Sequence, residues 1–315
     1  MYYVGIDLGG TNIAAALVNE NGDIIRKTSI PTFNERQYEE ICKDMGMLAK
    51  KVIEDEGISL DEVKSIGVGS PGTPDSENGI LIYTNNFKNF NNVPVRTEIQ
   101  KYVDLPVYLE NDANCAALGE SVVGAGKGYK DCVAITLGTG VGGGIIIDGK
   151  IVAGSFHGGA EIGHMVIQAG GEQCNCGRKG CFESYSSATA LIRDARIAAA
   201  KYPSCKINKL VNGDLSKMNA KIPFDAAQAG DEVAIKVIDR YISYLAVGIG
   251  NCINIFEPQV LIIGGGVCAQ KDNLLIPLIG KDKNECYGNA DLKTKITIAE
   301  LGNDAGIIGA AMLGK

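Results

Sequence analysis

The chain has 315 residues, which is long for one domain and comfortable for two. Its 30 basic and 37 acidic residues give a formal net charge of −7, which argues against nucleic acid or an anionic membrane surface as the main partner. No apolar run approaches the roughly 18 residues that a membrane-spanning helix needs, so we expect no membrane partner either.

The N-terminal segment has the pattern strand, glycine turn, strand over residues 4–18, followed by a hairpin turn at 19–22 and a third strand at 23–29. Backbone N–H groups in a glycine turn can bind phosphate, so we predict nucleotide contacts at Gly9, Gly10, Thr11 and Asn12. Asp7 ends the first strand, where it is placed to hold Mg²⁺ through water.

Residues 36–56 have the apolar spacing of a helix, and 65–70 and 107–110 read as strands. Either Asn111 or Asp112 suits the N-cap of the helix that follows. Taken alone, Asp112 would be interpreted as a cap. Because Asp112 lies beside Asn111 and is expected to face two phosphate-binding turns, we predict that it accepts a hydroxyl proton during phosphoryl transfer, as an aspartate does in other kinases.

The opening pattern returns at residues 133–147, with a hairpin turn at 148–149, and predicts two related α/β domains facing one another across a cleft. Residues 226–256 are expected to form a long helix, and the chain closes with a small-residue helix from residue 306. The second turn is predicted to contact phosphate through Thr136, Gly138, Thr139 and Gly140. Three glycines after a buried strand are expected to lie against a purine nucleoside: Gly264, Gly265 and Gly266.

Residues 161–183 contain three of the ten cysteines and one of the two histidines. One imidazole and three thiolates form a closed tetrahedral set for zinc, so we predict the ligands His164, Cys174, Cys176 and Cys181. Iron, or a disulfide within 174–181, is the alternative. We expect the flanking carboxylates Glu161 and Glu183 to lie with His164 on an irregular loop that the metal holds in place.

The other cysteines are scattered through mostly apolar runs and are predicted to be small buried residues: Cys42, Cys115, Cys132, Cys205, Cys252, Cys268 and Cys286. His157 is interpreted as a loop residue with no ligand role. Met1 leads directly into a strand-like segment, so we expect no secretory signal and a cytoplasmic location, where clustered Cys and His favour metal binding over disulfides.

These motifs in this order resemble the ROK family (repressors, open reading frames, kinases) of sugar kinases, within the actin-like ATPase superfamily. The resemblance covers essentially the whole chain, and within the family it is strongest to bacterial glucokinases. It rests on the segments at 7–11, 70–72, 110–114, 137–144, 161–164, 174–183 and 264–266. The pairing of Glu-x-Gly-His with Cys-x-Cys-Gly-x-x-Gly-Cys-x-Glu is its most specific part.

The resemblance implies an α/β fold of two actin-like (ribonuclease H-like) ATPase domains flanking a cleft, with the zinc-binding loop in the larger domain. It places the small domain at 1–112 plus 301–315 and the large domain at 113–300. Domain closure on the sugar would use hinges near 111–125 and 300–306. The cofactors implied are ATP, Mg²⁺ and a structural Zn²⁺.

By the same resemblance, Asp112 is the catalytic base, and the sugar is bound by Gly72, Asn111, Glu161, His164 and Glu183. His164 would present one ring nitrogen to zinc and the other to the sugar. Asn85, in the loop 73–93, is expected to contribute to the choice of sugar. Asn12 departs from the family, because many members carry lysine there.

The activity implied is ATP-dependent phosphorylation of a hexose at its 6-hydroxyl, with glucose converted to glucose 6-phosphate. The same motifs are shared by fructose, allose, N-acetylmannosamine and N-acetylglucosamine kinases of the family, which therefore stay open as alternatives. A sugar-sensing regulator without enzymatic activity is a further alternative. Family analogy suggests a homodimer or homotetramer.

Overall fold

The computed structural model describes residues 1–288 and 293–315. The chain separates into two compact units. Unit 1 comprises Met1–Cys132, Gly144–Ala160 and Glu300–Lys315, and unit 2 comprises Val133–Gly143 and Glu161–Ala299.

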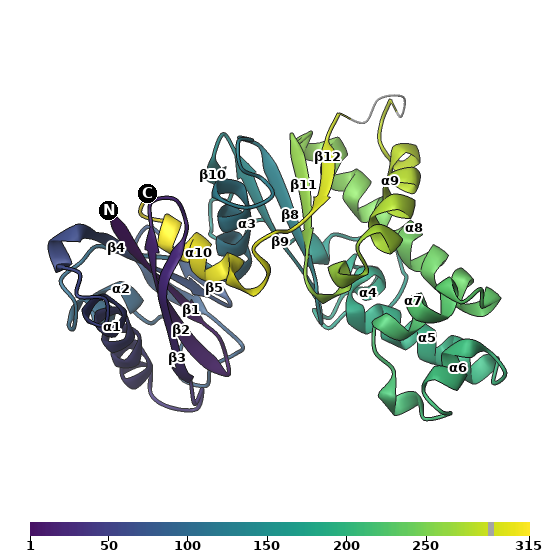
Figure 1. The fold of residues 1–315 in the computed structure, drawn as a ribbon, viewed down its shortest axis with the longest axis horizontal. Coiled ribbons are helices and arrows are strands. Elements are labelled where there is room, and N and C mark those ends of the chain that lie inside the picture. The colour runs from purple at the N-terminus through teal and green to yellow at the C-terminus, as the bar shows by residue number, and fades with distance from the viewer. Residues whose placement is uncertain (289–292) are drawn as a thin grey trace. The chain divides into compact units, whose positions relative to one another are not determined.

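Unit 1 is built on a five-stranded sheet of order β3-β2-β1-β4-β7 (Figure 1). The first three strands form an antiparallel meander: β1 (Tyr2–Leu8), β2 (Asn12–Asn19) and β3 (Ile24–Pro31). β4 (Val63–Ser70) runs parallel to β1, and β7 (Val107–Asn111) runs parallel to β4. The carboxyl ends of β1, β4 and β7 therefore meet at one edge of the sheet, where Asp7 and Asn111 lie.

Both faces of this sheet are covered by helices, in two different ways. On one face the alternating apolar side chains of β1 and β2 form a core with the apolar stripe of α1 (Tyr38–Glu54). On the other face α10 (Ala305–Met312) packs backbone against backbone. A Cβ atom on Gly5 would lie 1.9 Å from the Ile307 carbonyl oxygen, and one on Gly67 would lie 1.8 Å from that of Ala310. These two strand positions therefore require glycine.

Two of the remaining elements of unit 1, a hairpin and a helix, follow the carboxyl ends of strands of the sheet. β5 (Thr73–Asp75) and β6 (Ile80–Tyr83) form an antiparallel hairpin after β4. α3 (Asp112–Val122) follows β7 directly and packs against α10. The other helical segments are η1 (Leu60–Glu62), α2 (Val95–Gln100) and η5 (Gly302–Asp304).

The second sheet has the order β10-β9-β8-β11-β12 and repeats the arrangement of the first. β8 (Cys132–Leu137), β9 (Val141–Ile147) and β10 (Lys150–Ile151) correspond to the first meander, and β11 (Val260–Gly264) pairs in parallel with β12 (Lys295–Ile298). The expectation of two related α/β folds is therefore confirmed. Residues 144–160, which include β10 and most of β9, belong to unit 1. Unit 2 holds the segments η2 (Ile162–His164), α4 (Glu183–Ser186), α5 (Ala188–Lys201), α6 (Lys206–Leu210), η3 (Leu215–Lys217), α7 (Lys221–Gln228), α8 (Glu232–Phe256), η4 (Gly266–Gln270) and α9 (Asp272–Glu285).

The long helix expected over residues 226–256 is interrupted. α7 ends at Gln228, Gly230 has a φ of 80°, and α8 begins only at Glu232. The Asp231 side chain accepts a hydrogen bond from the Ala234 backbone N–H, which caps the new helix.

The domain boundaries expected from the sequence assign residues 113–122 to the large domain, whereas α3 lies in unit 1 beside α10. Those boundaries stay a prediction.

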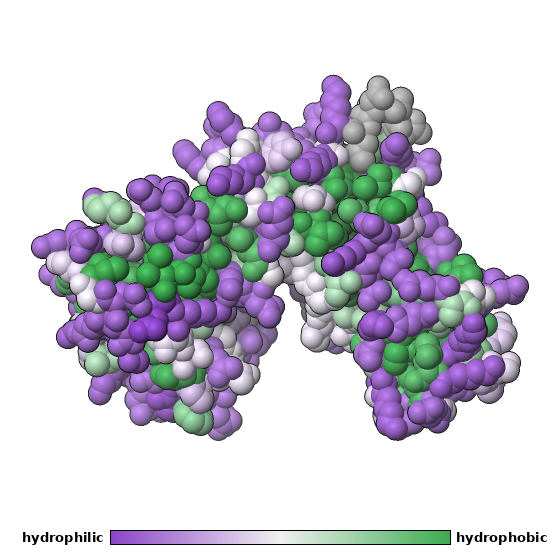
Figure 2. All heavy atoms as spheres, in the orientation of Figure 1, coloured by the Kyte–Doolittle hydropathy of each residue, from purple (hydrophilic) through white to green (hydrophobic). Residues whose placement is uncertain are grey.

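The face drawn in Figure 2 is covered largely by hydrophilic side chains, with hydrophobic patches between them. Among the described residues, no helix combines the length and the apolar character that crossing a membrane requires.

Candidate active site and metal centre

The end of β7 and the start of α3 form the first part of the site, in unit 1. Asn111 is the N-cap of α3, and its side-chain oxygen accepts hydrogen bonds from the backbone N–H groups of Ala113 and Asn114. Its Nδ2 donates to the Gly72 carbonyl oxygen at 3.0 Å. Asp112 is the first helical residue, and its Oδ1 also accepts from the Ala113 N–H at 2.9 Å, a group that Asn111 already satisfies.

The two aspartates of this edge both have a raised pKa. The pKa of Asp112 is raised above 3.8, because the surrounding protein penalises its charge, although part of the residue is exposed. The pKa of Asp7 is raised first by burial and then by the negative charge of Asp112, while Lys27 opposes the change. The fold therefore brings together the predicted base and the predicted magnesium ligand.

The first glycine turn is held by a buried threonine. The Gly9 N–H donates to the Asn12 carbonyl oxygen at 3.0 Å, which closes the turn between β1 and β2. The Thr32 hydroxyl donates a hydrogen bond to the Gly9 carbonyl oxygen. The Thr32 backbone N–H donates to the Thr11 carbonyl oxygen. Thr32 was not identified from the sequence, and nothing in its local pattern marks it, because its contacts depend on the pairing of β3 with β2.

The turn after β4 contains Gly72, which has a φ of 107°. A Cβ atom there would lie 2.1 Å from the Tyr83 carbonyl oxygen, so this turn against β6 requires glycine. The nearby Asn85 is exposed and accepts a hydrogen bond from the Tyr83 hydroxyl. Gly72 and Asn111 are thus brought together by the structure, and Asn85 lies beyond the end of β6.

The second glycine turn lies in unit 2, between β8 and β9. The Gly138 N–H donates to the Gly140 carbonyl oxygen, and the Gly138 carbonyl oxygen accepts from the Ala188 N–H at the start of α5. The Thr189 hydroxyl donates to the Thr139 carbonyl oxygen at 2.7 Å. The turn is therefore fixed by the first residues of α5, a support that no local sequence pattern indicates.

The three consecutive glycines lie at the carboxyl end of β11. Gly264 ends the strand, Gly265 has a φ of 87°, and Gly266 begins η4. A Cβ atom on Gly266 would meet nothing within 4 Å, so the backbone is open to the surroundings at this point. An exposed backbone is what close approach of a flat ring system requires.

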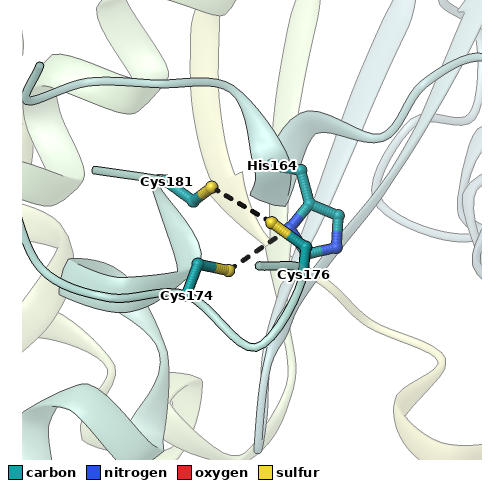
Figure 3. A group of neighbouring side chains, drawn as sticks. All are labelled: His164, Cys174, Cys176 and Cys181. Atoms are coloured by element: carbon teal, nitrogen blue, oxygen red, sulfur yellow. Dashed lines mark hydrogen bonds between the residues drawn. The ribbon is translucent and has the colours of Figure 1, made fainter. Parts of the chain in front are cut away.

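The four predicted metal ligands converge (Figure 3). His164 ends η2, while the cysteines come from the following loop, in which Val166 bridges to Cys181 and Gln173 to Lys179. His164 Nδ1 lies 3.7 Å from Cys174 Sγ, and Cys176 Sγ lies 3.6 Å from Cys181 Sγ. All four ligand atoms lie within 4.8 Å of one another.

These distances fit a tetrahedral zinc ion. Zn–S bonds of about 2.3 Å and Zn–N bonds of about 2.0 Å place neighbouring sulfur atoms about 3.8 Å apart and sulfur and nitrogen about 3.6 Å apart. No disulfide joins these cysteines in the structure. The backbone N–H of Arg178 lowers the pKa of the exposed Cys176 thiol to about 6, whereas burial raises that of Cys181. The cluster would hold zinc through Nδ1 of His164 and leave Nε2 for another partner.

The carboxylates beside the cluster do not both lie on an irregular loop, so that expectation is wrong. Glu183 is the first residue of α4, and His164 ends the 3-10 helix η2. Glu183 Oε2 accepts a hydrogen bond from the Val141 N–H at 3.0 Å, and Oε1 lies 3.8 Å from Cys174 Sγ. Glu183 thus connects the metal loop to the start of β9, while Glu161 is exposed.

The remaining cysteines and His157 lie outside the cluster. Six of these cysteines are buried, as expected, and Cys286 is half-buried. His157 lies in a loop with a φ of 58°, and its Nε2 is 3.4 Å from Asp75 Oδ1.

A parallel-stranded edge with two aspartates, glycine turns on two similar sheets and a Cys₃His cluster define a class of protein. The chain belongs to the ROK family, whose profile matches residues 3–315. It is similar to the glucokinase of Thermotoga maritima, with 39% identity over 310 residues covering 98% of this chain and 96% of that protein. It is also 30% identical to the xylose repressor of Caldicellulosiruptor bescii, over 83% of this chain and 65% of the repressor.

Among solved structures, the chain resembles a ROK family glucokinase from Streptomyces griseus in complex with glucose and AMPPNP. The TM-score is 0.79 and the identity 33%, with 99% of each chain covered.

Proposed function

We propose that this chain is an ATP-dependent glucokinase that transfers the γ-phosphoryl group of ATP to the 6-hydroxyl of glucose. The observation that carries the proposal is the carboxyl edge of the first sheet, where Asp112 begins a helix whose N-cap is already supplied by Asn111. The likeness to glucokinases over nearly their full length supports it, including one bound to glucose and a nonhydrolysable ATP analogue.

In unit 1, we assign Asp112 as the general base that accepts the proton of the attacking hydroxyl. Its raised pKa makes the carboxylate a stronger proton acceptor than an ordinary aspartate. Asn111 has one amide hydrogen on Gly72 and can offer the other to a sugar hydroxyl. Asp7 would hold Mg²⁺, which neutralises charge on the phosphates when bound. The turn Gly9–Asn12 would contact phosphate, and Asn12 brings no positive charge to it.

In unit 2, we assign Glu161, His164 and Glu183 as candidate hexose ligands. A bound zinc ion would fix the orientation of His164 through Nδ1 and leave its Nε2 to face a hydroxyl. Glu183 uses one oxygen on the Val141 N–H, so it is held in place before any ligand arrives. Thr139, Gly140 and the glycines at 264–266 are the candidate contacts to the nucleotide.

The similarity to a xylose repressor is the observation behind a second candidate function, a sugar-sensing regulator. The chain is 39% identical to the Thermotoga glucokinase and 30% identical to the repressor, and this difference in identity favours the kinase. Fructose, allose, N-acetylmannosamine and N-acetylglucosamine are the alternative acceptors, and a homodimer or homotetramer stays a prediction.

The test is ADP release by the zinc-loaded protein over a panel of hexoses and N-acetylhexosamines, with ATP and polyphosphate compared as donors. We expect the highest kcat/KM with glucose and ATP. A higher kcat/KM with another sugar would reassign the substrate, and no turnover with any sugar, together with sugar-dependent DNA binding in a gel-shift assay, would favour the regulator.

A further inference from the structure

Glu110, the penultimate residue of β7, is a buried carboxylate, only 5% exposed. Its two oxygens accept three hydrogen bonds. Oε1 accepts from the Asn111 backbone N–H at 2.8 Å and from Asn114 Nδ2 at 3.0 Å, and Oε2 accepts from the Ser76 hydroxyl at 3.0 Å. Hydrogen bonds to an ionised acceptor are the stronger kind, so this side chain fixes the groups around it.

The three donors come from two segments that carry the proposed site. Asn111 and Asn114 belong to the β7–α3 junction, on either side of Asp112. Ser76 follows β5, in a turn already fastened to β7 by Arg96, which donates to the carbonyl oxygens of Ser76, Glu77 and Val107. Glu110 therefore ties the first turn of α3 to the β5 hairpin that contains Gly72 at its start.

We propose that Glu110 is a positioning residue that sets the direction of Asn111 and Asp112 relative to the Gly72 turn. It touches no reacting atom and acts only through the two amides and the Ser76 hydroxyl that it holds. The proposal rests on the function proposed above. A displacement of about 1 Å in such a group can cost about 100-fold in rate, so loss of this carboxylate should be visible in turnover.

The contacts make glutamine an informative replacement. In Glu110→Gln, the amide oxygen can take the place of Oε1 and accept from Asn111 and Asn114. The amide nitrogen can donate to Ser76, because a hydroxyl is both donor and acceptor. All three contacts can form without the charge, while the second amide N–H and the hydrogen of the Ser76 hydroxyl lose their place in this network. Glu110→Ala instead removes all three and leaves buried donors unpaired.

The experiment compares kcat and KM for glucose in Glu110→Ala, Glu110→Gln and Glu98→Ala, each measured below its melting temperature. Glu98 is a matched control, since it is also a buried glutamate of unit 1 but binds Lys101 on α2. We expect kcat/KM to fall about 10- to 100-fold in Glu110→Ala, and to stay within about threefold of wild type in Glu110→Gln and in Glu98→Ala.

Turnover of glucose by the wild-type protein tests the proposed function. The positioning role of Glu110 is tested separately, by the kcat/KM values of Glu110→Ala and Glu110→Gln relative to each other. Equal turnover in Glu110→Ala and wild type would overturn it. So would a Glu110→Gln variant as slow as Glu110→Ala, because the charge and not the hydrogen bonds would then matter. If Glu110→Ala does not fold, the double variant Ser76→Ala, Asn114→Ala removes two of the three contacts and should still lower kcat/KM.

Discussion

Partial burial raises the pKa of Asp112 despite the hydrogen bonds of Ala113 and Asn111 that lower it, and its one helix-start contact, with the Ala113 N–H, is also made by Asn111. Asn111 caps α3, so replacement of Asp112 by asparagine preserves the shape of the helix start. The burial that raises the pKa of Asp112 also means that the ionised carboxylate costs stability. This combination is typical of a residue kept for its chemistry.

We expect Asp112→Asn to lower kcat by at least about 100-fold while sugar binding is retained, because only the proton acceptor is lost. Calorimetric titration with glucose and ADP release measure the two effects separately. The variant should be at least as heat-stable as wild type at neutral pH, since the amide carries no charge to be desolvated. Near-normal kcat would remove Asp112 as the base.

The pH dependence of kcat should have an acid limb that reports Asp112. As pH falls through the raised pKa, the carboxylate takes up a proton and can no longer accept one from the hydroxyl. The midpoint should therefore lie above 3.8, the ordinary value for aspartate. Nearby Asp7, whose pKa is also raised, contributes to the same limb. If the midpoint of the acid limb of kcat lay at or below 3.8, the burial that raises the pKa of Asp112 would be contradicted.

Individual residues were predictable where their neighbours in the sequence decide their role. Asn111 and Asp112 follow a strand and begin a helix, and both were identified, although the sequence did not decide which one is the cap. Thr32 and Glu110 depend on strand pairing and on a turn some 34 residues away. No local pattern could reveal those contacts.

At the scale of elements, the loop from His164 to Glu183 is held by backbone hydrogen bonds, such as that from the Gly180 N–H to the Glu172 carbonyl oxygen, and its four predicted metal ligands converge at one point. We expect Cys176→Ala to lose zinc and sugar phosphorylation together, because three ligands hold the ion less tightly than four and the loop then loses its anchor. Metal content and ADP release are measured on the same preparation. Cys205→Ala, a buried cysteine of unit 2 outside the cluster, is the control. Full turnover in zinc-free Cys176→Ala protein would refute this role.

A second element-scale prediction concerns Glu120, near the end of α3 and only 3% exposed. Its carboxylate accepts hydrogen bonds from the backbone N–H groups of Ala125, Glu300 and Leu301. Unpaired buried donors cost about 1–3 kcal/mol each, so Glu120→Ala should lower the free energy of unfolding by about 3 kcal/mol or more. Urea unfolding measures it, with the exposed Glu77→Ala as control, and a loss of less than about 1 kcal/mol would show that water replaces the carboxylate.

The convergence of His164, Cys174, Cys176 and Cys181 was predictable from residue type and spacing, and zinc as the bound metal stays a prediction. The helix at Glu183 and its bond to Val141 were not predictable, since they arise from the packing of the loop against β9. The interruption at 229–231 was missed for a related reason. Apolar periodicity continues across Gly230 and conceals the cap at Asp231.

At the scale of the whole molecule, the repeated strand–turn–strand pattern correctly predicted two related α/β folds, and the structure adds that their sheets have matching strand orders. The extent of any domain closure, the oligomeric state and the choice of hexose stay predictions, because they depend on contacts that a repeat pattern does not encode.

The central claim is that this chain converts glucose and ATP to glucose 6-phosphate. The most direct measurement follows the sugar product by phosphorus NMR, with wild type and Asp112→Asn incubated under the same conditions. We expect the signal of a phosphate ester at the 6-hydroxyl to appear with wild type and to be nearly absent with the variant. Phosphate on another hydroxyl, equal product from both proteins, or ATP consumed without a sugar ester would contradict the account.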